Sequence, residues 1–158
     1  MKLGIDIGRV IIAPGDDNAD TSFLRGSLED ALRTPPNEGM FDAVPELVRR
    51  FEGRAWLISK CGPKIQDKTR RWLDHHRFFE RTGIPPKNLR FCLLRPQKAD
   101  HCRELGITHF IDDRTDVLEA LSEIVPSRFL FGPQKAGRPI PGGVVHVLTW
   151  PDALAAIR

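Results

Sequence analysis

The chain opens with Lys2-Leu3-Gly4-Ile5-Asp6-Ile7-Gly8-Arg9-Val10, a short apolar run that leads into an acidic residue. This run predicts a buried β-strand with Asp6 at its carboxyl end. A later apolar run also ends in acids, at Asp112 and Asp113. In an open parallel sheet the ligand crevice lies at the carboxyl ends of the strands, where carboxylates can hold a hard cation against a phosphorylated ligand. The two strand ends are therefore predicted to share one metal ion.

Short apolar runs recur along the whole chain, and most of them lack polar alternation, as is typical of strands buried on both faces. They cover residues 3–5, 55–58, 91–94, 109–111, 128–131 and 144–148. Helical spacing of apolar residues fills much of the sequence between them, at 41–51, 65–79 and 117–124. Pro63 suits an early helix position, Gly106 a helix end, and Thr115 or Asp116 a helix cap. Alternating strands and helices predict an α/β fold, a Rossmann-like three-layer sandwich with a central parallel sheet.

The length of 158 residues suits one domain with a full core and is too short for two substantial ones. We therefore predict a single domain over residues 1–158, with a short insertion at about 9–40. Turn-forming residues mark 14–18 and 35–39 within this insertion, and 22–33 can form a short helix. A second loop rich in Gly and Pro is predicted at 132–143.

The formal net charge of +3 comes from scattered Lys and Arg residues. Their densest stretch, 64–71, also carries Asp67 and is typical of a solvated helix face, so the charge pattern does not predict a nucleic-acid partner. No apolar run reaches membrane-spanning length, and the N-terminus lacks the pattern of a signal peptide, which predicts a cytoplasmic protein. Cys61, Cys92 and Cys102 are an odd number without C-x-x-C spacing, so they are expected to be reduced thiols.

Four segments in order resemble the motifs of the haloacid dehalogenase-like (HAD) superfamily. The first motif of that family is D-x-D-x-[TV], and the sequence here is Asp6-Ile7-Gly8-Arg9-Val10. Ser59 after the second apolar run is similar to the second motif, Lys98 at a helix start to the third, and Asp112-Asp113 to the fourth. The resemblance covers roughly residues 1 to 125.

The resemblance implies a HAD-like fold and a set of roles. Asp6 is the nucleophile; Asp6, the backbone carbonyl of Gly8 and Asp112 are the protein ligands of Mg²⁺, the implied cofactor. Ser59 hydrogen-bonds a phosphoryl oxygen, and Lys98 balances charge and orients Asp6. The implied function is a Mg²⁺-dependent phosphohydrolase or phosphotransferase that acts on a small phosphorylated substrate through an aspartyl-phosphate at Asp6.

Further residues flank the expected crevice and are assigned to the outer environment of the metal or to the substrate; they are Asp113, Arg9, Lys60 and Arg114. Asp113 is expected to pair with Lys98 or to lie beyond the direct metal ligands. Arg9 and Arg114 can instead make surface ion pairs. Lys60 and Arg95 compete with Lys98 for the cationic role.

The remaining assignments also have structural alternatives. Asp6 can cap a turn at a strand end, and Ser59 can cap the helix that follows it. HAD proteins often carry a cap domain between the first two strands. The short insertion here predicts no large cap and an open or minimally capped site, which admits bulky substrates or needs a partner to close it.

Gly8 stands where the phosphatases of this superfamily have a second Asp, which protonates the leaving oxygen and then activates water. Help of this kind contributes about 10²- to 10⁴-fold, or roughly 3 to 5 kcal/mol of barrier. Three interpretations follow: an activated substrate, an acid supplied by Asp16 or Asp17, or a catalytically impaired phosphate-binding or protein-interaction domain. Superfamily members that act on carbon–halogen or carbon–phosphorus bonds also lack this Asp, which keeps other chemistry open.

Overall fold

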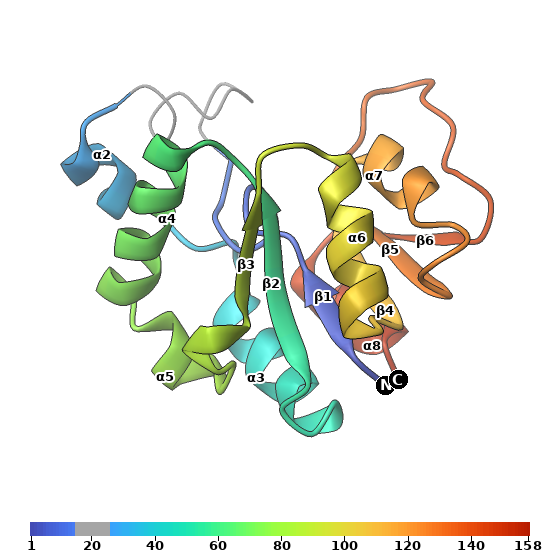
Figure 1. The fold of residues 1–158 in the computed structure, drawn as a ribbon, viewed down its shortest axis with the longest axis horizontal. Coiled ribbons are helices and arrows are strands. Elements are labelled where there is room, and N and C mark those ends of the chain that lie inside the picture. Colours follow the sequence, from blue (N-terminus) through green and yellow to red (C-terminus); the bar gives the residue numbers. More distant parts are fainter. Residues whose placement is uncertain (15–25) are drawn as a thin grey trace.

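The structure, a computed structural model, describes residues 1–14 and 26–158 (Figure 1). Its centre is a sheet of six parallel strands in the order β3-β2-β1-β4-β5-β6. The strands are β1 (Leu3–Ile5), β2 (Ala55–Lys60), β3 (Leu89–Cys92), β4 (His109–Asp112), β5 (Ser127–Phe131) and β6 (Val144–Val147). The predicted α/β fold with a central parallel sheet is confirmed.

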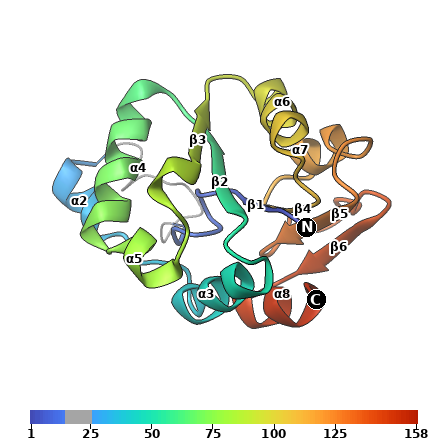
Figure 2. The same ribbon diagram turned by 60° about the horizontal axis from the view of Figure 1, so that its bottom comes forward.

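Helices cover both faces of this sheet (Figures 1 and 2). They are α2 (Leu28–Arg33), α3 (Met40–Arg50), α4 (Pro63–His75), α5 (Phe78–Thr82), α6 (Pro96–Leu105), α7 (Thr115–Ala120) and α8 (Trp150–Ala156), with a 3₁₀ turn at Pro86–Asn88. Buried residues of α3, α4, α5 and α8 form one core cluster with the sheet, and those of α6 and α7 form the other. The three layers of the predicted sandwich are therefore present.

Alternation along the strands distributes their side chains between the two cores. Leu3 and Ile5 of β1 lie in the cluster with α3 and α8, whereas Gly4 between them faces the other side. A Cβ at Gly4 would lie 2.5 Å from the ring of Phe110 on β4. Gly4 therefore permits the close approach of that ring to the strand.

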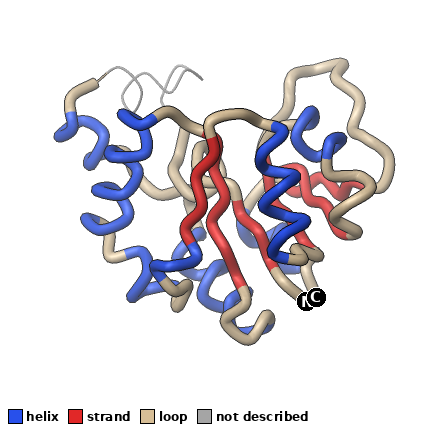
Figure 3. The backbone as a smooth tube through the Cα atoms, in the orientation of Figure 1, coloured by secondary structure: helices blue, strands red, loops and turns tan. Residues whose placement is uncertain are grey.

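The order of the strands reverses at β1. Figure 3 draws the strands in red with the helices around them in blue. From β1 the chain adds β2 and then β3 on one side, and α6 carries it back so that β4 pairs with β1 on the other side. In open α/β sheets the ligand crevice lies outside the carboxyl ends of the strands at such a switch point. The fold thus directs attention to the ends of β1 and β4.

The segment predicted as an insertion, at about 9–40, contains α2 in its described part, and α3 follows it before β2. Ser27 caps α2: its hydroxyl accepts from the amide of Asp30, and the Asp30 carboxylate accepts from the Ser27 amide. The predicted helix at 22–33 is thus observed from Leu28, and its residues 22–25, with Asp16 and Asp17, lie outside the described residues. Among the helices of residues 1–14 and 26–158, none is long and apolar enough to cross a membrane.

The prediction of one continuous helix at 65–79 is wrong, because the helix in the structure ends at His75. Arg77 adopts a left-handed backbone with φ 54°, and α5 begins at Phe78. The ring of His76 packs on Trp72 at a centroid distance of 4.2 Å, and its Nε2 lies 3.1 Å from the carbonyl of Leu32. These contacts with α4 and α2 favour the turn over a straight helix.

Two boundary predictions also need correction. The strand predicted at 91–94 lies at Leu89–Cys92, because the side-chain oxygen of Gln97 accepts from the amides of Leu93 and Leu94 and holds them in the turn before α6. Helix α7 begins after Arg114, and no side chain caps it there, so the predicted cap at Thr115 or Asp116 is wrong.

Candidate active site

Asp6 and Asp112 lie side by side at the carboxyl ends of β1 and β4. The register pairs Ile5 with Ile111, and the amide of Asp6 donates to the carbonyl of Ile111 at 3.0 Å. Carboxylate oxygens of Asp6, Asp112 and Asp113 all lie within 4.8 Å of one another. The structure therefore brings the predicted metal-binding carboxylates together, and it adds Asp113 to them as a candidate direct ligand.

Lys98 supplies the positive charge of this cluster. It lies in the first turn of α6, is only 3% exposed, and its Nζ donates to Oδ1 of Asp6 at 3.0 Å and to Oδ2 of Asp112 at 2.8 Å. Burial lowers the pKa of a lysine, but the charges of Asp6 and Asp112 outweigh this effect and raise the pKa of Lys98 above its ordinary value. Lys98 is therefore the protonated partner of both carboxylates, ahead of Lys60 and Arg95.

One lysine does not neutralise three carboxylates. Burial and the charge of Asp6 raise the pKa of Asp112 to about 6. Burial, with the charges of Asp6 and Asp112, raises the pKa of Asp113 to about 8. Clustered oxygen donors with surplus negative charge are the ligand set that Mg²⁺ takes in proteins. The donor set thus fits the implied cation, which would be held by Asp6, Asp112 and Asp113 with the carbonyl of Gly8.

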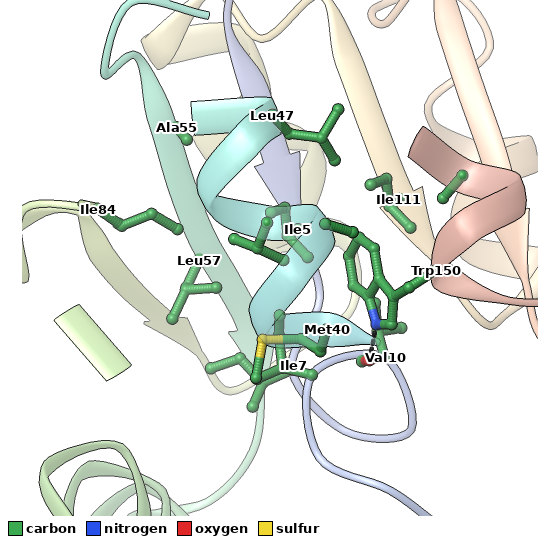
Figure 4. Close-up of a cluster of buried hydrophobic side chains, with 14 of the residues drawn as sticks. Ile5, Ile7, Val10, Met40, Leu47, Ala55, Leu57, Ile84, Ile111 and Trp150 are labelled. Atoms are coloured by element: carbon green, nitrogen blue, oxygen red, sulfur yellow. Dashed lines mark hydrogen bonds between the residues drawn. The ribbon is translucent and has the colours of Figure 1, made fainter. Parts of the chain in front are cut away.

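The turn after β1 is held by side chains from distant parts of the chain. Nδ2 of Asn37 donates to the carbonyls of Arg9 at 2.7 Å and Val10 at 2.9 Å. Nε1 of the buried Trp150, at the start of α8, donates to the carbonyl of Val10 at 2.9 Å (Figure 4). Arg9 sits in the left-handed region with φ 63°, which is unfavourable for a residue with a Cβ. These hydrogen bonds hold that conformation beside Asp6.

Gly8 is exposed, and the backbone conformation at this position does not require a glycine. Its φ lies outside the left-handed region, and a Cβ built on it meets no heavy atom within 4 Å. A side chain at this position is therefore compatible with the backbone of the turn.

Ser59 is the penultimate residue of the neighbouring strand β2 and is buried, whereas Lys60, which ends the strand, is exposed. In the register of β1 and β2, it comes two residues after Leu57, which pairs with Ile5. Helix α4 begins after Gly62 without a side-chain cap, so Ser59 does not cap it.

Cys61 follows this strand end, and burial raises the pKa of its thiol to about 11. A thiol this hard to ionise is a poor nucleophile.

A cleft of about 1390 Å³ adjoins the carboxylate cluster at Asp113. Arg9 and Arg114 line it, together with residues from the start of α3, the loop after β5 and the start of α8. Arg114 also pairs with Asp116, which Arg95 contacts from the start of α6 at 3.2 Å. The two predicted arginines thus reach the cleft, while Arg114 makes the ion pair of the alternative interpretation as well.

Three residues of the site were not singled out by sequence reasoning. Asn37 was assigned to a loop, Trp150 to no role, and Gln134 to the second loop, where its Nε2 donates to the carbonyl of Asp113 at 3.1 Å. A side-chain amide in a turn-rich segment is a weak signal for Asn37. The sequence carries no local signal for the contacts of Trp150 and Gln134, because their partners lie far away along the chain.

Two solved structures have a fold similar to that of this chain. D,D-heptose 1,7-bisphosphate phosphatase from B. bronchiseptica, solved with magnesium and phosphate, matches with a TM-score of 0.70 at 14% identity, over 99% of this chain and 97% of its own. A Burkholderia xenovorans LB400 protein described as a haloacid dehalogenase-like hydrolase matches with a TM-score of 0.53 at 14% identity. That match covers 85% of this chain and 61% of the other.

No protein-family model matches the sequence, and neither does any curated protein. At 14% identity the structural matches support the fold alone. The chemistry has to be argued from the residues.

Proposed function

We propose that this protein is a Mg²⁺-dependent phosphohydrolase or phosphotransferase that acts on a small phosphorylated substrate through an aspartyl-phosphate at Asp6. The observation that carries the proposal is the buried contact of Lys98 with both Asp6 and Asp112 at the switch point of the sheet. The phosphatase of similar fold that was solved with magnesium and phosphate supports the same ligand class.

Each residue has a defined task in this mechanism. Lys98 holds the Asp6 carboxylate through Oδ1 and compensates its charge as an anionic phosphate approaches. The Asp6 carboxylate attacks phosphorus, the bond from phosphorus to the leaving oxygen breaks, and water or another acceptor later takes the phosphoryl group. Ser59 hydrogen-bonds a phosphoryl oxygen. Bound Mg²⁺ supplies charge neutralisation of the phosphoryl oxygens.

The absence of an acid at Gly8 sets the class of substrate. A leaving oxygen of high pKa needs a proton during bond cleavage, whereas acyl and aryl oxygens leave as anions. We therefore propose that the substrate is an activated phosphate of the acyl or aryl type. In a transferase, the phosphoryl group would pass between two oxygens that are both good leaving groups.

The test is a panel of acyl, aryl and alkyl phosphates assayed with Mg²⁺ and with a chelator. Asp6→Asn keeps the shape of the side chain but removes the nucleophile, so hydrolysis should disappear while the fold persists. Asp74→Asn, an exposed acid on α4, is the matched control and should leave the rate unchanged. Hydrolysis that survives in Asp6→Asn would rule out Asp6 as the nucleophile.

A second candidate function is phosphate binding without turnover, and Gly8 favours it. The structure retains the carboxylates and Lys98, which recognise metal and phosphate, and lacks the side chain that protonates a leaving group. Phosphate binding that depends on Mg²⁺, with no turnover of any ester in the panel, would establish this alternative.

A further inference from the structure

The cleft beside Asp113 extends to the loop between β5 and β6, which presents Lys135 and Arg138 to it. Both side chains are exposed, and within residues 1–14 and 26–158 neither makes an ion pair. Arg114 in the same cleft is different, because it already makes an ion pair with Asp116. The loop therefore places two cations with uncompensated charge in the space that a substrate's leaving group would occupy.

The near end of this loop is fastened to the carboxylate cluster. Nε2 of Gln134 donates to the backbone carbonyl of Asp113 at 3.1 Å and to that of Phe131 at 3.4 Å. Lys135 is the next residue in the chain, so its backbone position is tied to that of Asp113. The distance from the reacting centre to the loop cations is constrained by this bond.

The far end is fastened by a buried cation. Arg128 of β5 is 8% exposed and donates through Nη2 to the carbonyl of Gly142 at 3.2 Å. Between the two anchors, the amide of Arg138 donates to the carbonyl of Lys135 at 3.2 Å, which puts both cations on one turn. The turn is therefore a defined element of the cleft wall.

The cleft also carries charge of the other sign. Glu38, which precedes α3, and Asp42, in the first turn of that helix, line it as well. Carboxylates there repel an anionic group and accept hydrogen bonds from hydroxyls. A second anion in the cleft is thus directed to the side of Lys135 and Arg138.

We infer that the leaving group of the substrate carries a second anionic group, a carboxylate or phosphate, which Lys135 and Arg138 bind. The inference rests on the proposed function, since it assigns the far end of the same cleft. The turn that carries Lys135 and Arg138 would then determine substrate specificity. Gln134 would position this turn relative to Asp113.

The test measures binding by calorimetry with excess Mg²⁺, using a series of ω-carboxyalkyl phosphates of increasing length and their methyl esters. Each pair differs by one negative charge. A hydrogen-bonded charge of this kind should strengthen binding about tenfold at the best length. The double variant Lys135→Gln with Arg138→Gln should abolish the difference between acid and ester. Lys87→Gln with Arg158→Gln removes two charges outside the cleft and should preserve it.

Gln134→Ala should keep the preference for the acid but flatten its dependence on chain length, because the loop loses its tie to Asp113. Equal affinity of acids and esters, a preference that persists in the double loop variant, or no binding of either series would overturn the inference. Preferential binding of the acid with no hydrolysis of any phosphate ester would uphold the inference and reject the proposed enzymatic function.

Discussion

The missing acid is best tested by Gly8→Asp. The structure predicts that the change is tolerated, because the φ of Gly8 is outside the left-handed region and a new Cβ meets nothing within 4 Å. Replacing glycine at a compatible position contributes about 0.4–1 kcal/mol of stability through the unfolded chain. A fourth carboxylate beside three others opposes this gain until Mg²⁺ is bound. We expect a folded protein of similar stability when Mg²⁺ is present.

The rate effect should depend on the leaving group. If the new carboxyl protonates the leaving oxygen, hydrolysis of alkyl phosphates should rise by about 10²- to 10⁴-fold, a lowering of the barrier of roughly 3 to 5 kcal/mol. Aryl and acyl phosphates leave readily as anions and should gain much less. Steady-state rates across a series of leaving groups would measure this, with Gly8→Asn as the control that has nearly the same shape and no acid.

Two results would refute the reasoning in different ways. A Gly8→Asp protein that folds and binds Mg²⁺ yet hydrolyses neither class would reject the phosphatase interpretation. Native protein that already hydrolyses alkyl phosphates at ordinary enzymatic rates would show that another residue donates the proton, and Asp16 and Asp17 would be mutated next.

Three other perturbations have defined outcomes. Lys98→Met leaves Asp6 and Asp112 buried without a cation and should cost about 3–5 kcal/mol in urea unfolding without metal; an unchanged midpoint would contradict the pairing. Asn37→Ala removes two hydrogen bonds from the turn after β1 and should lower the free energy of unfolding by about 2 kcal/mol. The accompanying loss of activity, expressed as an increase in the activation free energy, should be larger than this loss of stability. In the metal-free folded protein the pKa values of Asp112 and Asp113 are about 6 and about 8, above their ordinary value of 3.8. Between these values the folded protein binds more protons than the unfolded chain. The melting temperature should therefore fall as the pH rises from about 4 to 8. Mg²⁺ binds the deprotonated carboxylates and should reduce or reverse this slope, and a metal-independent slope would argue against a shared metal site.

Local patterns were sufficient for the elements of the sheet. Apolar runs such as the one before Asp6 mark strands buried on both faces, and the helical spacing between them requires parallel crossovers. The apolar runs alone placed the candidate carboxylates at strand ends, because each acid directly follows its run. The break at Arg77 was missed because the apolar spacing continues through it, while contacts of His76 with α2 and α4 determine the turn.

The tertiary structure decided which strand ends meet and what holds them. The pairing of β1 with β4, the approach of Asp113 to Asp6, and the anchoring of the turn by Asn37 and Trp150 all join residues far apart in the chain. The last of these contacts spans 140 positions. Periodicity reports only which face of an element is apolar. The partner of a buried amide or indole N–H is set by where the folded chain brings a free carbonyl, so such contacts leave no mark in the local sequence.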